Sequence, residues 1–226
     1  MIRAKHTKWA ELIFEKYLDS IFKKSFSDIN LIGEIPEISD DEQLVILPNH
    51  STWWDGFFVW YLNKILFQRK FYIMMLEARL KKYNFFSNLG AFSIDQNNPK
   101  SIIETFSYIN TILQSKDRII LNYYPQGELL PNFIRPIKIQ PGILKIIRNF
   151  NGNLSVIPLG IRAEFLGDRL PYVFFNLGKP IDTKKEESAI ILDIQSSIED
   201  CLKTIEFNII NSNLGRVIFE GKKSPK

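Results

Sequence analysis

Residues 43–56 read QLVILPNHSTWWDG, and this stretch carries the strongest structural signal in the chain. The apolar run within Gln43 to Leu47 predicts a buried strand. Thr52, three positions before Asp55 and ahead of an aromatic-rich run, is typical of the start of a helix. The polar residues Asn49 to Ser51 therefore lie at the carboxyl end of a strand, which is where open α/β sheets bind ligands.

The same alternation of short apolar runs with helical patterns continues along the chain. It predicts an α/β fold with a mostly parallel central sheet flanked by helices. The clearest helix runs from about Pro99 to Gln114, where Asn98 is the expected N-cap, and a last amphipathic helix covers roughly Glu186 to Ile210. Further helices are expected after Thr52, Ala78 and Pro141. The expected strands are Gln43 to Leu47, Phe71 to Leu76, Ala91 to Ile94, Arg118 to Tyr123, Leu154 to Leu159 and Tyr172 to Leu177.

The N-terminal residues 1–26 show an amphipathic helix pattern, so we divide the chain into this helix, a main domain of residues 27–219 and a polar tail of residues 220–226. Such a helix either packs on the domain or lies in a membrane interface. No segment reaches the roughly 18 uninterrupted apolar residues of a membrane span, and the N-terminus lacks the apolar region of a signal peptide. The expected apolar side of the helix consists of Trp9, Leu12, Ile13, Tyr17, Leu18, Ile21 and Phe22.

Composition excludes several classes of protein. The chain has 226 residues, 45% of them hydrophobic and 24% charged, which is typical of a folded globular protein and not of a disordered one. The single cysteine, Cys201, cannot form a disulfide within the chain and favours a cytosolic location. With two histidines and no cluster at ligand spacing, we expect no structural metal.

Charge is modest in total but uneven along the chain. The net charge of +4 and the absence of a recognition motif argue against nucleic-acid binding. Residues 27–50 hold six acidic residues and no Lys or Arg, whereas residues 129–163 hold no acidic residue. The second stretch is either a surface that faces an anion or a solvated basic face without a ligand. Its basic residues are Arg135, Lys138, Lys145, Arg148 and Arg162.

His50 and Asp55 form the candidate catalytic pair. Each also has a structural interpretation, because a lone histidine is often structural and Asp55 can serve only to cap a helix. The two side chains can touch if the helix begins between them, as a Thr52 cap would arrange. An aspartate that accepts the imidazole N–H leaves the other ring nitrogen free to take a proton from a hydroxyl group. Because the chain lacks a G-x-S-x-G, Walker or G-x-G-x-x-G motif, we expect that hydroxyl to belong to a substrate.

Four sequence blocks resemble those of the glycerolipid acyltransferases, the PlsC-like family of 1-acylglycerol-3-phosphate O-acyltransferases and their relatives. The segment Asn49 to Asp55 resembles the family's N-H-x-S/T-x-x-D block, and the other three blocks follow in the family's order. The resemblance covers roughly Leu31 to Ile181. The remaining blocks are Gly90-Ala91-Phe92-Ser93-Ile94-Asp95-Gln96, Tyr124-Pro125-Gln126-Gly127-Glu128 and Val156-Ile157-Pro158-Leu159, with Ile137 to Gly142 similar to a lysine-then-glycine segment after the third.

The resemblance implies an O-acyltransferase in which His50 is the general base and Asp55 orients it. The implied donor is acyl-CoA or an acylated carrier protein, without a bound cofactor or an acyl-enzyme intermediate, and the acceptor is a lipid hydroxyl at a membrane surface. Backbone N–H groups around Gly127 are candidates for stabilising the oxyanion. The expected location is the cytoplasm, peripheral to the inner face of the membrane.

The departures from the family pattern concern the acceptor. Family members that use a phosphorylated glycerol have an arginine at each of the positions occupied here by Gln96 and Leu129. Neither residue can replace a charge-assisted phosphate clamp, so we expect an acceptor without a phosphomonoester, such as a glycolipid, aminolipid or carotenoid-type lipid. Lysophosphatidate is the alternative, with phosphate contacts from Lys138, Arg135 or Arg148. The candidate substrate-binding residues are Asp95, Gln96, Gln126, Gly127, Glu128, Arg135 and Lys138.

Three further points remain open in the sequence. A thioesterase-like hydrolase, with His50 activating water, and a catalytically silent lipid-binding module are alternatives to acyl transfer. The basic stretch also suits an acidic acyl carrier protein. The aromatics after His50 are expected to divide between the core and an acyl tunnel; they are Trp53, Trp54, Phe57, Phe58, Trp60 and Tyr61.

Overall fold

The computed structural model describes residues 1–222 and contains one eight-stranded sheet with the strand order β4-β3-β5-β2-β6-β7-β1-β8. Within the described residues, five of the seven neighbouring strand pairs are parallel, and the pairs β1–β8 and β6–β7 are antiparallel. The predicted α/β class is therefore confirmed. The strands are β1 (Asp28–Ile32), β2 (Gln43–Pro48), β3 (Lys70–Leu76), β4 (Ala91–Ile94), β5 (Ile119–Asn122), β6 (Leu154–Glu164), β7 (Tyr172–Leu177) and β8 (Arg216–Glu220).

The helices cover the two faces of this sheet. Asn98 caps its helix as expected, because its side chain accepts hydrogen bonds from the backbone N–H groups of Lys100 and Ser101. None of the helices formed by residues 1–222 is both long and apolar enough to cross a bilayer. The helices are α1 (Lys8–Ser25), α2 (Asp55–Leu62), α3 (Glu77–Lys82), α4 (Pro99–Leu113), α5 (Gly142–Asn149) and α6 (Glu187–Ile210), with the π-helix η1 (Asn63–Phe67) and the 3-10 helix η2 (Asn84–Leu89).

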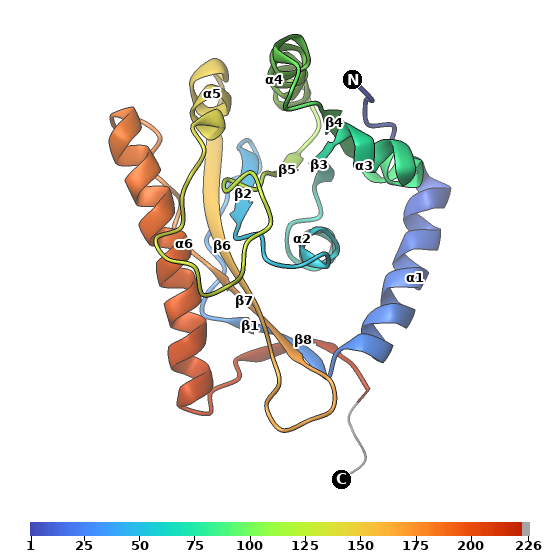
Figure 1. The fold of residues 1–226 in the computed structure, drawn as a ribbon, viewed down its shortest axis with the longest axis vertical. Coiled ribbons are helices and arrows are strands. Elements are labelled where there is room, and N and C mark those ends of the chain that lie inside the picture. The colour runs from blue at the N-terminus through green and yellow to red at the C-terminus, as the bar shows by residue number, and fades with distance from the viewer. Residues whose placement is uncertain (223–226) are drawn as a thin grey trace.

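Alternation along β2 divides the core into two layers. Leu44 and Ile46 point to one face, where they pack in a cluster with residues of α1 and α2. Val45 and Leu47 point to the other face and pack with residues of α4, α5 and α6. Successive side chains of a strand point to opposite faces, so a continuous apolar run is what a strand covered on both sides requires. Figure 1 shows α1 and α6 on opposite sides of the sheet.

Two strands were absent from the sequence prediction. β1 is fully buried although it contains Asp28 and Asn30, and β8 lies along it as an antiparallel edge strand. The predicted tail is wrong at its start, because Glu220 belongs to β8 and the N–H of Gly221 donates to the carbonyl of Ser27 at 2.8 Å. Residues 223–226 of that tail lie outside the described residues. Both strands depend on partners distant in sequence, which local patterns cannot reveal.

Helix α1 has two apolar faces, whereas the sequence pattern predicts one. Phe14, Leu18 and Phe22 are buried against the domain, whereas Trp9 and Ile13 are more than half exposed. A helix advances about 100° per residue, which places the stripe Trp9-Ile13-Tyr17 roughly opposite Leu18. The helix therefore both packs on the domain and presents an apolar surface to its surroundings. The exposed apolar residues of α1 are Trp9, Leu12, Ile13 and Tyr17, which we call the outer stripe.

The parallel pairing brings four chain segments to one edge of the sheet. Because β2, β3, β4 and β5 run in the same direction, their carboxyl ends meet at the same edge. His50 follows β2, helix α3 follows β3, Gln96 follows β4 and Gly127 follows β5. The candidate site lies at this edge.

Candidate active site

His50 lies in the turn between β2 and α2, close to the first residue of the helix. Its Nδ1 is 2.8 Å from Oδ2 of Asp55, the contact expected if the helix begins between the two residues. Because a carboxylate can only accept, Nδ1 carries the hydrogen. The Asp55 side chain is fully buried, whereas a quarter of the His50 side chain is exposed. Nε2 is therefore the ring nitrogen left to act on a substrate.

The Asp55 carboxylate also holds the turn itself. Its Oδ2 accepts the backbone N–H groups of Ser51 at 2.7 Å and Thr52 at 2.9 Å. Its Oδ1 accepts the Thr52 hydroxyl at 2.6 Å, and the Thr52 oxygen in turn accepts the N–H of Trp54. Helix α2 begins at Asp55 and has no side-chain cap at Trp54, so the predicted Thr52 cap is replaced by this turn, which the Asp55 carboxylate holds while it also contacts the imidazole. The structural and catalytic interpretations of Asp55 are therefore compatible.

The third sequence block holds His50 from the opposite side. The Tyr124 ring stacks on the imidazole with the ring centroids 4.0 Å apart and the planes 22° from parallel. The Tyr124 hydroxyl accepts a hydrogen bond from Asn122. Burial and the nearby charge of Asp55 raise the pKa of Tyr124 well above its ordinary value, so the phenol stays neutral beside the pair. The backbone N–H of His50 donates to Oε1 of Gln126 at 2.8 Å.

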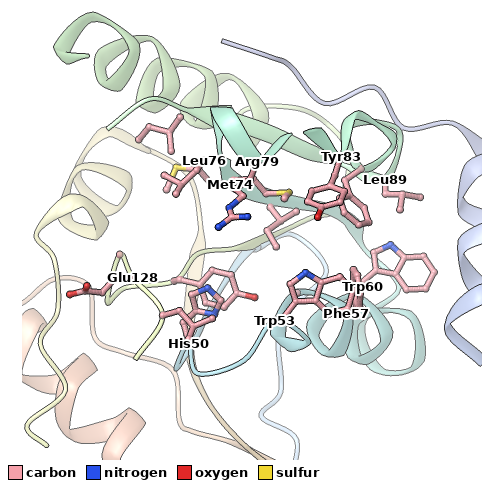
Figure 2. A pocket seen from close by; sticks show the side chains of 18 of the residues that line it. His50, Trp53, Phe57, Trp60, Met74, Leu76, Arg79, Tyr83, Leu89 and Glu128 are labelled. Carbon is pink, nitrogen blue, oxygen red and sulfur yellow. The ribbon is translucent and has the colours of Figure 1, made fainter. Parts of the chain in front are cut away.

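A cavity of about 520 Å³ opens at His50, within the size range of small-molecule sites. Figure 2 shows His50 and Glu128 toward one side and the aromatic side chains Trp60 and Tyr83 toward the other, near α1. The site therefore combines a polar end at the candidate catalytic pair with an apolar extension suited to a hydrocarbon chain. The apolar extension includes Phe14, Trp60, Phe71, Phe86 and Leu89.

The aromatics that follow His50 divide as expected between core and cavity. Trp53, Phe57 and Trp60 line the cavity. Phe58 and Tyr61 are buried and pack against Phe22 of α1. Helix α2 is therefore apolar on more than one face because it contacts both the core and the cavity.

Three of the predicted substrate-binding residues line the cavity: Gln96, Gly127 and Glu128. Leu129 lines it too, so both positions where the family carries arginine face this space and both are uncharged here. The departure noted in the sequence therefore changes the cavity wall itself.

The other four predicted residues are not part of the cavity wall. Gln126 is buried and occupied with the N–H of His50, while an Asp95 oxygen accepts the N–H of Asn97 in its own turn. The guanidinium of Arg135 donates to carbonyl groups of its own loop, and Lys138 is exposed elsewhere. Arg135 and Lys138 are near the third block in sequence, but they do not reach the cavity because the chain turns away after Leu129.

Arg79 lines the cavity from α3, although no sequence motif marks it as a site residue. In sequence it is one of three basic residues in Glu77–Lys82, and only the packing of α3 over the end of β3 distinguishes it from Lys81 and Lys82. Figure 2 shows its guanidinium directed into the cavity.

The backbone around Gly127 is where the sequence predicts the donors for an oxyanion. Gly127 adopts the left-handed region with φ +75°, and its own N–H donates to the carbonyl of Tyr124. The N–H groups of Glu128 and Leu129 make no hydrogen bond within residues 1–222 and are the available donors. In the same range, no three His, Cys, Asp or Glu side chains converge to hold a metal ion.

Comparison with known proteins identifies the family of the chain. The family model described as Acyltransferase matches residues 30–162. Among solved structures, the 1-acyl-sn-glycerophosphate (LPA) acyltransferase PlsC from Thermotoga maritima is similar in fold, with a TM-score of 0.58 and 16% identity over 87% of this chain and 78% of that one. No curated protein matches the chain. Since the family model covers more than half of the sequence, the chain belongs to the acyltransferase family and is an acyltransferase.

Proposed function

We propose that this acyltransferase moves a fatty acyl group from a thioester donor to the hydroxyl of a lipid acceptor, with His50 as general base and Asp55 as its orienting carboxylate. The observation that carries the proposal is the 2.8 Å contact between His50 Nδ1 and Asp55 Oδ2 at the polar end of an otherwise apolar cavity. A buried carboxylate on one nitrogen makes the other a competent base.

The proposed reaction needs no group that the chain lacks. Nε2 of His50 takes the proton of the acceptor hydroxyl while its oxygen attacks the thioester carbonyl carbon. The backbone N–H groups of Glu128 and Leu129 stabilise the tetrahedral oxyanion. The carbon–sulfur bond then breaks, and the protonated His50 returns the proton to the departing thiolate. The products are an ester and a free thiol.

For the acceptor, we propose a lipid alcohol without a phosphomonoester. Gln96 and Leu129 are uncharged where a phosphate clamp would need arginines, and both line the cavity. Lysophosphatidate, the substrate named for the Thermotoga maritima enzyme, is the competing acceptor.

We further propose that the enzyme works at a membrane surface, on the cytoplasmic side. The outer stripe, Trp9-Leu12-Ile13-Tyr17, lies opposite the face of α1 that packs on the domain. The Trp9 ring also lies 6.2 Å from that of Phe85, which is itself exposed beside the cavity-lining Phe86. An apolar surface with Trp and Tyr next to the apolar end of the cavity suits a lipid interface.

The donor is proposed to be acyl-CoA or an acylated carrier protein. Arg135, Lys138, Lys145 and Arg148 are exposed, and an acidic carrier would be attracted to such a basic surface. Higher salt would then slow the reaction with the carrier-bound donor.

The test is the His50→Ala variant, with His6→Asn as the matched control because His6 is the other histidine and lies outside the cavity wall. Each protein is incubated with acyl-CoA or acyl carrier protein and a panel of lysolipids, and the products are identified by mass spectrometry. His50→Ala is expected to lower ester formation by at least roughly 100-fold with its circular dichroism unchanged.

Each alternative has its own outcome in this experiment. Release of free acid without ester identifies a hydrolase, and the absence of any turnover by the wild type identifies a lipid-binding module. Unchanged ester formation in His50→Ala refutes the general-base role. Selective use of lysophosphatidate refutes the altered acceptor alone.

A further inference from the structure

Arg79 is the only lysine or arginine, among the described residues, that lines the cavity. It comes from α3, in the connection between β3 and β4, whereas His50 and Asp55 lie in the connection between β2 and β3. Its guanidinium points into the cavity (Figure 2). Within residues 1–222 this guanidinium has neither a hydrogen bond nor an ion pair. By contrast, Lys81 on the same helix is paired with Glu77.

Arg79 is exposed, so water solvates its guanidinium, and the group needs a new partner once a bound substrate displaces that water. The apolar wall beside it, including Met74, Met75 and Leu76, offers no acceptor side chain, and Glu128 on the wall is not paired with it. Desolvating a charge is unfavourable unless it is paired, so the bound substrate is the natural source of the anion. Guanidinium groups match the geometry of phosphate and carboxylate oxygens.

The positions of charge on the wall strengthen this argument. The two family arginine positions are neutral here, as Gln96 and Leu129, and yet the cavity retains one cation in a different segment. The basic residues of the third-block region, Arg135 and Lys138, do not reach the cavity. Any anionic group that enters beside His50 therefore meets Arg79 as its only cationic side chain among the described residues.

We propose that Arg79 is the anion-binding residue of this site and that it binds a phosphate group of a substrate. The phosphate is either a phosphodiester in the head group of the acceptor, which an acceptor without a phosphomonoester can still carry, or the phosphate of the phosphopantetheine arm of the donor. This inference rests on the proposed function for the identity of the substrates, but binding can be measured without turnover.

The test measures ligand binding by quenching of tryptophan fluorescence, because Trp53 and Trp60 line the cavity. Two matched pairs of short-chain probes are titrated: 1-acylglycerol-3-phosphocholine against 1-acylglycerol, and acyl-CoA against the acyl thioester of N-acetylcysteamine. The proteins are the wild type, Arg79→Ala, Arg79→Lys and the control Lys82→Ala, which removes a charge of α3 that lies outside the cavity wall.

Arg79→Ala is expected to weaken binding of the phosphate-bearing member of one pair roughly 10- to 100-fold, the effect of losing charge-assisted hydrogen bonds. The unphosphorylated member of that pair, and all four probes with Lys82→Ala, keep their affinity. Arg79→Lys recovers part of the loss. The pair that responds identifies the source of the phosphate.

Two results would overturn the proposal. Either Arg79→Ala changes the affinity of no probe, or it weakens both members of a pair equally, which would indicate a role in shaping the cavity. Absence of acyl transfer by the wild type would refute the proposed function and would not affect this binding result.

Discussion

Replacing Asp55 separates its structural role from its proposed catalytic one, because the structure accounts for every hydrogen bond that its carboxylate accepts. Oδ2 accepts three bonds, from His50 Nδ1 and the N–H groups of Ser51 and Thr52, and Oδ1 accepts the Thr52 hydroxyl. In Asp55→Asn the amide oxygen can take the place of Oδ2 and keep those three bonds. The amide NH₂ then faces the Thr52 oxygen, which has a second lone pair beside the one used by Trp54.

The expected effects on folding and on catalysis therefore differ in size. Reversing one hydrogen bond should lower the free energy of unfolding by about 1 kcal/mol. Loss of the negative charge removes the stabilisation of the imidazolium that forms when His50 takes a proton. This should lower kcat roughly 100- to 10,000-fold, or about 3 to 5 kcal/mol of transition-state stabilisation. Asp55→Ala is a poorer test, because it removes the acceptor of all four donors, and each donor left without a partner costs about 1 to 3 kcal/mol of folding stability.

The assay measures initial rates of ester formation together with urea unfolding followed by tryptophan fluorescence. Thr52→Val is the matched control, since it removes the hydroxyl that donates a hydrogen bond to Asp55 and keeps the Asp55 carboxylate. We expect Thr52→Val to lose about 1 kcal/mol of unfolding free energy with kcat within tenfold of the wild type. A near-normal kcat in Asp55→Asn would show that this residue only caps the helix, and the catalytic argument would fail.

Two further predictions concern regions outside the pair. The double variant Trp9→Ser, Ile13→Ser should weaken co-sedimentation with anionic vesicles roughly 30-fold, because two half-exposed apolar side chains contribute about 2 kcal/mol of binding free energy. The control is Phe207→Ser, which changes an exposed side chain on α6. Equal binding by the wild type and both variants would exclude docking through the outer stripe. Burial and, to a lesser extent, the charge of Lys70 lower the pKa of His6 from 6.5 to about 4. As the pH drops, the unfolded chain therefore binds a proton at His6 at a higher pH than the folded chain does. The free energy of unfolding should fall by at most about 3 kcal/mol between pH 6.5 and pH 4. Denaturant titrations at several pH values should show a smaller fall for His6→Asn, which suits the left-handed backbone there; the same fall would contradict the prediction.

The sequence alone predicted those parts that depend on local chemistry. The helix Pro99–Leu113 begins where Asn98 and Pro99 predict, because a cap and its helix lie within a few residues of each other. The contact between His50 and Asp55 depends on the same kind of local information, since the hydrogen bonds between Thr52 and Asp55 close the turn that separates His50 from the start of α2. Continuous apolar runs such as β2 were recognisable because both faces of a parallel strand are covered.

Tertiary structure alone decided which side chains reach the cavity. Arg135 and Lys138 lie near the third block in sequence and away from the site in space, while Arg79 reaches it from a helix whose charges look alike in sequence. Strand β8 likewise exists because it pairs with β1, nearly two hundred residues away along the chain. Contacts between distant segments depend on how the sheet is ordered, and that order follows from the packing of both layers together and not from any single stretch of sequence.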